Sequence, residues 1–133
     1  MKDSNSIKKN AGFVNKFLKK ELKGNPKQLY DAASHLILHG GKRLRPFLVL
    51  KSCQMLGGRQ SDAIAAASAV EMIHNFTLVH DDIMDNDEMR HGVPTTHKKF
   101  DVPLAILAGD VLYSKAYHTI SSKSKLSSNY TTQ

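Results

Sequence analysis

The segment AIAAASAVEMIHNFTLVHDDIMD, residues 63–85, lies within the longest stretch of this chain without glycine or proline. It predicts one helix from Ala63 to Met84, for which Ser61 or Asp62 is the expected N-cap. Apolar side chains recur along this helix, namely Met72, Ile73, Phe76, Val79 and Ile83. The helix is therefore expected to pack into a core and to carry the charges at its end to the edge of a cavity.

Three aspartates, Asp81, Asp82 and Asp85, lie at the C-terminal end of the predicted helix. At about 100° per residue, Asp81 and Asp85 are about 40° apart around the helix axis, and Asp82 flanks them. Like charges beside the negative end of a helix dipole repel one another unless a cation neutralises them. Magnesium can do so, because it binds one or two carboxylates and completes its shell with water and phosphate oxygens. The alternative is an acidic helix end that is simply solvated.

A basic motif precedes this helix and reads Gly40-Gly41-Lys42-Arg43-Leu44-Arg45-Pro46. The glycine pair frees the backbone and the proline favours a helix start, so the three basic side chains are expected between two helices. Arginine offers a planar fork to phosphate and lysine a mobile charge, and this mixture suits a diphosphate. The simpler interpretation is that these side chains solvate a helix end.

The other segments with apolar periodicity also predict helices, and none alternates as a β-strand does. Glycine and proline mark the boundaries between them. The expected helices cover about residues 6–23, 26–39, 45–56 and 103–122, with a loop over 86–100 and a polar segment over 123–133. The fold class is therefore predicted to be all-α.

The chain has 133 residues, of which 41% are hydrophobic, and a formal net charge of +7. The single cysteine, Cys53, is expected to be a buried, inert thiol and fits a reducing compartment. No apolar run approaches the ~18 residues of a membrane span, and no signal-peptide pattern follows Met1. The basic residues are not interleaved with aromatics, so nucleic-acid binding is not expected. We expect a cytoplasmic protein, with a solvated basic face formed by Lys8, Lys9, Lys16, Lys19, Lys20 and Lys23.

Together these motifs resemble the N-terminal half of the trans-isoprenyl diphosphate synthase, or polyprenyl synthetase, family. The resemblance covers about residues 29–122, and its pattern is most similar to the archaeal geranylgeranyl and farnesyl diphosphate synthases. It implies a bundle of antiparallel helices around a deep cavity, of which this chain would supply the N-terminal helices, and a homodimer. The residues that carry it are 40–46, His74, 81–85, Arg90-His91-Gly92-Val93-Pro94-Thr95 and Leu107-Ala108-Gly109-Asp110.

The resemblance also implies a reaction and its metal ion. Enzymes of this family use Mg²⁺ to condense isopentenyl diphosphate with an allylic diphosphate, which can be dimethylallyl, geranyl or farnesyl diphosphate. By position, Asp81, Asp82 and Asp85 would be the catalytic residues, with Asp81 and Asp85, joined by Asp82, as the ligands of the metal ion. The chemistry is electrostatic: cations stabilise the departing diphosphate, and no nucleophilic side chain is required.

The resemblance implies substrate contacts as well. Lys42, Arg45 and His74 match residues that hold isopentenyl diphosphate, and Arg90 matches an arginine that contacts the allylic diphosphate. His91 stands where the family commonly has a second arginine, so it would be at most a weak, pH-dependent phosphate ligand.

Product length has a possible determinant in Phe76 and Thr77, five and four positions before the first aspartate, where the family forms the floor of the hydrocarbon pocket. A phenylalanine ring would block a prenyl tail that the smaller threonine lets pass. Phe76 could equally be a core residue. The other histidines, His35, His39, His80, His97 and His118, lack metal-binding spacing and are expected to be structural or surface residues.

The chain contains one aspartate-rich motif, whereas the family has a second one further along. We therefore expect residues 1–122 to be the N-terminal part of a single, truncated polyprenyl synthetase domain that is inactive by itself. Its inner helix faces, with Met72, Phe76 and Val79, would then be exposed. Two functions remain open: a prenyltransferase or part of one, and a non-catalytic subunit or truncated paralogue that pairs with a complete synthase.

Overall fold

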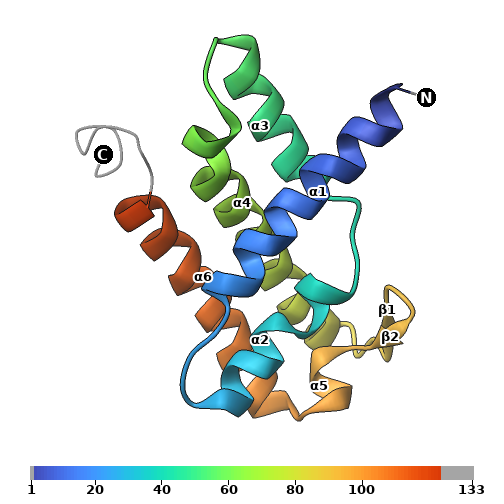
Figure 1. Cartoon of the computed structure of the whole chain (residues 1–133). Coiled ribbons are helices and arrows are strands. Elements are labelled where there is room, and N and C mark those ends of the chain that lie inside the picture. Colours follow the sequence, from blue (N-terminus) through green and yellow to red (C-terminus); the bar gives the residue numbers. More distant parts are fainter. Residues whose placement is uncertain (1, 124–133) are drawn as a thin grey trace.

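A computed structural model describes the backbone of residues 2–123 and the side chains of residues 4–123. Within this part of the chain two short strands, β1 (Met89–Arg90) and β2 (Val93–Pro94), pair as an antiparallel hairpin. All other regular structure is helical, which confirms the predicted all-α class (Figure 1). The helices are α1 (Lys2–Glu21), α2 (Lys27–His39), α3 (Leu44–Met55), α4 (Gln60–Met84), α5 (Thr96–Lys99) and α6 (Val102–Lys123).

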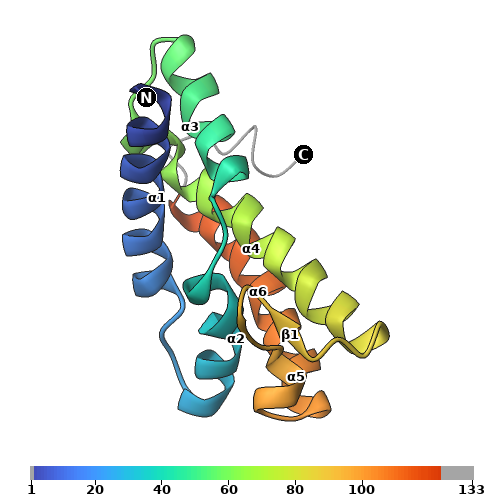
Figure 2. The same ribbon diagram turned by 90° about the vertical axis from the view of Figure 1, so that its right-hand side faces the viewer.

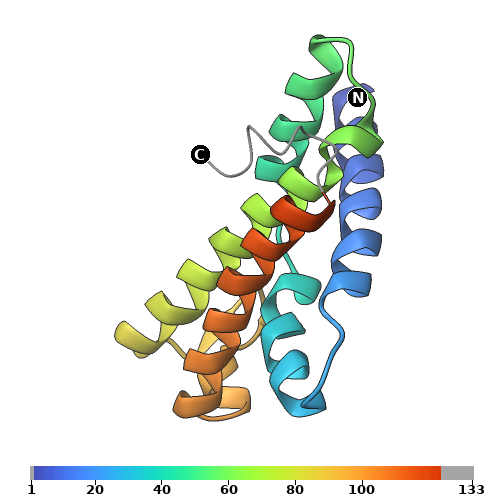
Figure 3. The same cartoon turned by 90° about the vertical axis from the view of Figure 1, so that its left-hand side faces the viewer.

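The long helix α4 is the main support of the structure, because it packs against both α6 and α3. Figure 3 shows α4 and α6 running side by side over most of their length. The close approach depends on Gly109 of α6, where an added Cβ would lie 2.3 Å from Nε2 of His80 on α4. The largest fully buried side chains come from α1, α2, α3, α4 and α6, and they include Leu18, Leu36, Ile37, Leu50, Met72, Val79 and Leu112.

Burial corrects two of the sequence expectations. Met72 and Val79 are buried, so they do not form an exposed inner face as expected, because the helices packed around α4 cover them. Cys53 is only half-buried, and its thiol lies 3.5 Å from the carbonyl oxygen of Arg59. By contrast, the expected solvated basic face is confirmed, since its six lysines are all exposed.

Helix boundaries differ from the prediction by a few residues. Helix α1 begins at Lys2 and not near Ser6. Arg59, and neither Ser61 nor Asp62, is the N-cap of α4, so that prediction is wrong. The Asp62 carboxylate instead accepts the backbone N–H of Arg59 at 2.9 Å, which satisfies a helix-end donor from the third helical position.

The segment between α4 and α6 was predicted to be a loop, which is wrong for most of it. His91 and Gly92 have φ of 53° and 75°, the left-handed values that a tight two-residue hairpin turn requires. The hairpin is held to α2, because Nε2 of His35 donates to the carbonyl oxygen of Pro94 at 2.7 Å. Figure 2 shows the hairpin beside α2 and next to the end of α4.

The end of the described region includes one residue of the predicted polar segment. Lys123 is the last residue of α6 and forms an ion pair with the buried carboxylate of Glu21 on α1. The rest of that segment, residues 124–133, lies outside the described residues. Among residues 2–123, no helix is both long and apolar enough to cross a membrane.

Candidate active site

Asp81 and Asp85 stand together at the C-terminal end of α4. Asp85 is the C-cap, and its N–H donates to the carbonyl oxygen of Asp81 at 2.8 Å. Both side chains are exposed, next to the negative end of the helix dipole. Within residues 2–123, no three His, Cys, Asp or Glu side chains are grouped so that they could hold a metal ion. Two exposed carboxylates still fit magnesium, which takes its remaining ligands from water and phosphate.

Asp82 has a different environment from the other two aspartates. Its side chain is fully buried. Oδ1 accepts a hydrogen bond from Nε of Arg90 at 2.8 Å and forms an ion pair with Nη2 of the same side chain at 2.6 Å. Its other oxygen, Oδ2, is buried and has no hydrogen-bond partner among the residues that the structure describes. The ion pair with Arg90 is the contact that the structure shows for Asp82, and its role as a metal ligand stays a prediction. Asp82 holds Arg90.

The basic loop between α2 and α3 begins with two glycines, Gly40 and Gly41, and Gly40 lies against the hairpin. At Gly40 an added Cβ would lie 2.6 Å from the Cβ of His91, so only glycine allows this contact without a shift. Gly41 has a φ of 95°, a backbone conformation that favours glycine. The loop and α4 enclose a cavity of about 170 Å³, which is lined by Lys42, Arg45, His74, His91 and neighbouring residues.

Two cations of this cavity, Lys42 and Arg45, are available to bind an anion from the solvent. Lys42 and Arg45 are exposed, and in the described part of the chain neither side chain makes a hydrogen bond or an ion pair. The pKa of His74 is lowered from its ordinary value, first by burial and then by the positive charge of Arg45. Glu71 opposes this shift, and Arg90 and His91 add smaller lowering effects. His74 is therefore a neutral imidazole among positive charges, and a bound anion would favour its protonation.

The charge of Arg90 acts both on the aspartate motif and on this cavity. Its hydrogen bond to Asp82 raises its pKa, and the negative charges of Asp87 and Asp81 add to this effect. Arg90 also acts on His74, whose pKa it lowers. One guanidinium therefore joins the acidic end of α4 to the cationic cavity.

The sequence did not reveal a buried polar cluster that consists of Arg43, Glu71 and Asn75. Arg43 was grouped with the phosphate-binding cations, but it is only 4% exposed and pairs with Glu71 at 2.9 Å. Asn75 supports Glu71 by donating to its carbonyl oxygen at 2.9 Å. The sequence feature that could have indicated this cluster is Glu71, a glutamate on the apolar helix one turn before His74.

The two expected chain-length residues point in different directions. Phe76 is half-buried, and its ring centroid lies 4.7 Å from that of His80 and 5.2 Å from that of Tyr113 on α6. Thr77 is exposed, and its hydroxyl donates to the carbonyl oxygen of His74 at 2.7 Å. Thr77 precedes Asp81 by four residues, so both lie on the same side of α4, whereas Phe76 belongs to the contact between α4 and α6.

Several of the remaining histidines are tied into the fold. His35 is buried and bonded to Pro94, and His39 Nδ1 lies 2.6 Å from the carbonyl oxygen of His35. His80 packs at Gly109, and His97 is buried within α5. His118 is exposed. These positions fit the expected structural and surface roles.

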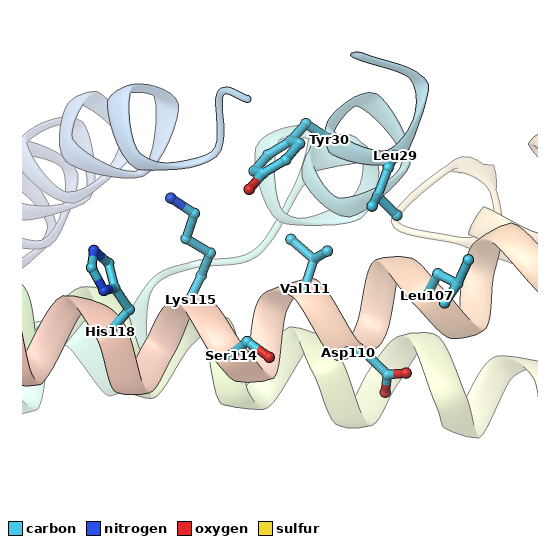
Figure 4. Close-up of a pocket in the computed structure, with 8 residues that line it drawn as sticks. All are labelled: Leu29, Tyr30, Leu107, Asp110, Val111, Ser114, Lys115 and His118. Atoms are coloured by element: carbon cyan, nitrogen blue, oxygen red, sulfur yellow. The ribbon is translucent and has the colours of Figure 1, made fainter. Parts of the chain in front are cut away.

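A larger hollow of about 480 Å³ lies elsewhere, between α2 and α6. In Figure 4, Leu29 and Tyr30 of α2 face Val111 and Lys115 of α6 across it. The Lys115 ammonium lies 5.7 Å from the centroid of the Tyr30 ring. Asp110, from the fifth matching motif, borders this hollow and not the cationic cavity.

Comparison with known proteins gives consistent matches. The family model described as Polyprenyl synthetase matches residues 26–132. The geranylgeranyl pyrophosphate synthase of Geoglobus acetivorans is 53% identical over 119 residues, which make up 89% of this chain and 37% of that protein. The geranylgeranyl diphosphate synthase of Saccharolobus solfataricus is 52% identical over 107 residues, which make up 80% of this chain and 32% of that protein.

Solved structures agree with the sequence matches. The structure of the Geoglobus acetivorans geranylgeranyl pyrophosphate synthetase superposes with a TM-score of 0.89 at 50% identity, covering 94% of this chain and 41% of that one. The corresponding synthetase from Pyrococcus horikoshii gives a TM-score of 0.90 at 43% identity, covering 96% of this chain and 39% of that one. The chain therefore spans less than half the length of these relatives.

Proposed function

Since this chain belongs to the polyprenyl synthetase family, we propose that it supplies the isopentenyl diphosphate site and the first magnesium site of a short-chain prenyltransferase. The reaction would join isopentenyl diphosphate to dimethylallyl, geranyl or farnesyl diphosphate and yield geranylgeranyl or farnesyl diphosphate. The names of the two relatives above favour the geranylgeranyl product.

The observation that carries this proposal is the position of Arg90. It forms an ion pair with Asp82 in the aspartate motif, and its charge lowers the pKa of His74 in the cationic cavity, so its guanidinium lies near both groups. Two diphosphates that must react with each other require two adjacent anion sites, one of them with a metal ion. A cation between the two sites can hold one diphosphate without separating it from the other.

The individual roles follow from exposure and charge. Lys42 and Arg45 would bind isopentenyl diphosphate, assisted by His74 and more weakly by His91. The cavity is smaller than the about 300–1,000 Å³ of pockets that enclose drug-sized ligands, so it fits a diphosphate headgroup better than a prenyl chain. Asp81 and Asp85 would hold Mg²⁺, which supplies charge stabilisation for the leaving diphosphate.

The remaining expectations belong to the same proposal. Thr77, on the Asp81 side, and Phe76, at the contact with α6, would limit the length of the prenyl chain. We propose that residues 1–122 form part of one polyprenyl synthetase domain, that the enzyme is a homodimer, and that it works in the cytoplasm. The competing hypothesis is a non-catalytic subunit that binds a complete synthase.

The test is metal-dependent binding of an allylic analogue to the chain. Geranyl S-thiolodiphosphate is titrated calorimetrically with and without Mg²⁺ into the wild type, Asp81→Ala and Asp85→Ala. We expect Mg²⁺-dependent binding that weakens at least about tenfold in both variants, since each removes one metal ligand. Asp31→Ala, which removes an exposed carboxylate from the Lys27 ion pair on α2, is the matched control and should bind normally. Equal affinity in all four proteins would refute the metal site.

A further inference from the structure

Arg43 is the buried member of the basic motif. It is 4% exposed, whereas Lys42 and Arg45 on either side face the solvent. Its Nη1 lies 2.9 Å from Oε1 of Glu71, and both side chains are almost fully buried. A buried charge is tolerated only with a partner of opposite charge and with further hydrogen bonds, so Arg43 and Glu71 fix each other's position.

The guanidinium of Arg43 ties the loop to three helices. Nε donates to Oδ1 of Asn15 on α1 at 2.8 Å, and Nη1 donates to the carbonyl oxygen of Gly40 at 2.7 Å in addition to Glu71 on α4. Nη2 donates to the carbonyl oxygen of Ile37 in the last turn of α2. The last carbonyls of a helix have no partner within the helix, so Arg43 satisfies groups that would otherwise be buried without a bond.

The backbone of the loop is shaped around this side chain. Arg43 itself has a φ of 54°, in the left-handed region that residues other than glycine rarely adopt. At Gly41 an added Cβ would lie only 2.9 Å from Nη1 of Arg43. Strained residues persist where their surroundings hold them, and they gather at functional sites. The second glycine of the motif therefore leaves room for the buried pair.

Glu71 connects the loop to the histidine of the cavity. Glu71 and His74 are three residues apart on α4, so they lie on one face of the helix, one turn from each other. Both residues line the same cavity as Lys42 and Arg45. The contact that anchors the loop therefore also sets the distance between its two exposed cations and His74.

We propose that Arg43 and Glu71 are positioning residues, which hold Lys42 and Arg45 against His74 so that the loop is preorganised for a diphosphate. This role rests on the proposed function. Their role would be to hold the loop and not to bind the diphosphate. A loop without this pair would keep its exposed cations but would have to order them upon binding, at a cost in affinity.

The test compares two ligands in two variants of the chain. Arg43→Lys keeps the positive charge, but the single ammonium group of lysine cannot bond to acceptors on α1, α2 and α4 at the same time. The double variant Arg43→Met with Glu71→Met removes both charges together, which buried ion pairs often tolerate without loss of stability. We expect isopentenyl diphosphate to bind at least about tenfold more weakly to both, since small displacements of binding groups are costly. Binding of geranyl S-thiolodiphosphate with Mg²⁺ should change less than about twofold.

The control is Glu21→Gln, which removes the charge of another buried carboxylate at the contact between Glu21 and Lys123. It should lower thermal stability and leave both affinities unchanged. Wild-type affinity for isopentenyl diphosphate in the folded double variant would overturn the positioning role. An equal loss of affinity for both ligands would also overturn it, because it would indicate that the pair is purely structural. If the unaltered chain bound neither ligand, the proposed function itself would fail, and the positioning role with it.

Discussion

We predict that loss of charge changes the free energy of unfolding differently at Asp81, Asp82 and Asp85, the three aspartates of one motif. Asp82→Asn should lower the free energy of unfolding by about 1–3 kcal/mol, because it weakens the buried bond to Arg90. Asp81→Asn and Asp85→Asn should be neutral or stabilising, since each relieves repulsion at the negative end of α4. Urea denaturation of the three variants measures this difference. A stability loss at Asp81 equal to that at Asp82 would contradict the assignment of Asp82 to Arg90.

His74 should report anion binding through its own titration. Its pKa is lowered in the free protein, mainly by burial, so its contribution to stability is present above pH ~6.5 and is lost as the pH falls below this value. A diphosphate in the cavity should raise this pKa, because negative charge favours the imidazolium. NMR titration of the His74 ring with and without pyrophosphate measures the change, and His74→Gln assigns the signal. An unchanged pKa with bound pyrophosphate would place the ligand elsewhere.

Charge type and spacing selected the aspartates and the basic motif, and the resemblance to the family selected His74, but burial was not visible in the sequence. Lys42, Arg45 and His74 were selected from the sequence, and the structure brings them to one cavity. Asp82 and Arg43 were grouped with neighbours of the same charge, yet both are buried in ion pairs. Their partners, Arg90 and Glu71, are 8 and 28 residues away. Such pairings depend on tertiary contacts, which a local pattern does not contain.

Among the elements, the long helices were predictable and the hairpin was not. Apolar periodicity and glycine or proline boundaries identified every helix longer than one turn, with ends shifted by up to four residues. The hairpin has strands of two residues, too short to show alternation, and its turn is His91-Gly92 and not the usual Asn-Gly. Its contact with His35 on α2 comes from a residue 59 positions away.

The contact between the basic loop and the hairpin can be tested at Gly40. Gly40→Ala would place a Cβ 2.6 Å from the Cβ of His91, so the hairpin and the loop must separate. We expect unfolding to become easier by about 1–3 kcal/mol and isopentenyl diphosphate to bind more weakly. Gly12→Ala in α1 is the control, because nothing lies within 4 Å of its added Cβ, and it should stabilise the chain by about 0.4–1 kcal/mol. Thermal unfolding and calorimetric titration measure both effects, and a Gly40→Ala chain with wild-type stability and affinity would contradict this contact.

At the scale of the whole molecule, the candidate site is open to water. Asp81 and Asp85 are exposed, and the neighbouring cavity has only about 170 Å³. An allylic cation requires surroundings that exclude water, because water would otherwise capture it. We therefore expect the 133-residue chain to bind both diphosphates but to form no prenyl product from farnesyl and isopentenyl diphosphates in a radiolabel assay. Product formation at a rate that Asp81→Ala abolishes would contradict this expectation.

The surface of α6 carries an apolar stripe that bears on assembly. Val102, Ile106, Tyr113 and Tyr117 are 43%, 43%, 44% and 60% exposed, and their spacing of four, seven and four residues places them along one helix face. The hydroxyl groups of Tyr113 and Tyr117 lie 3.5 Å apart. Next to Tyr117, a groove of about 250 Å³ is lined by apolar side chains of α4 and α6, including Val70, Ile73 and Ile120. Contiguous apolar surface of this kind is typical of contact regions and not of an isolated monomer.

This stripe should make the chain self-associate. We expect sedimentation velocity to show a concentration-dependent increase in mass, and a hydrophobic dye to fluoresce with the dilute protein, because association buries apolar area at about 25 cal/mol per Å². Tyr117→Lys should reduce both signals, since a charge in the stripe must be desolvated upon contact. Gln54→Lys adds the same charge to an exposed polar position on α3 and should change neither signal. A monodisperse monomer that does not bind the dye would show that this face is not a contact surface.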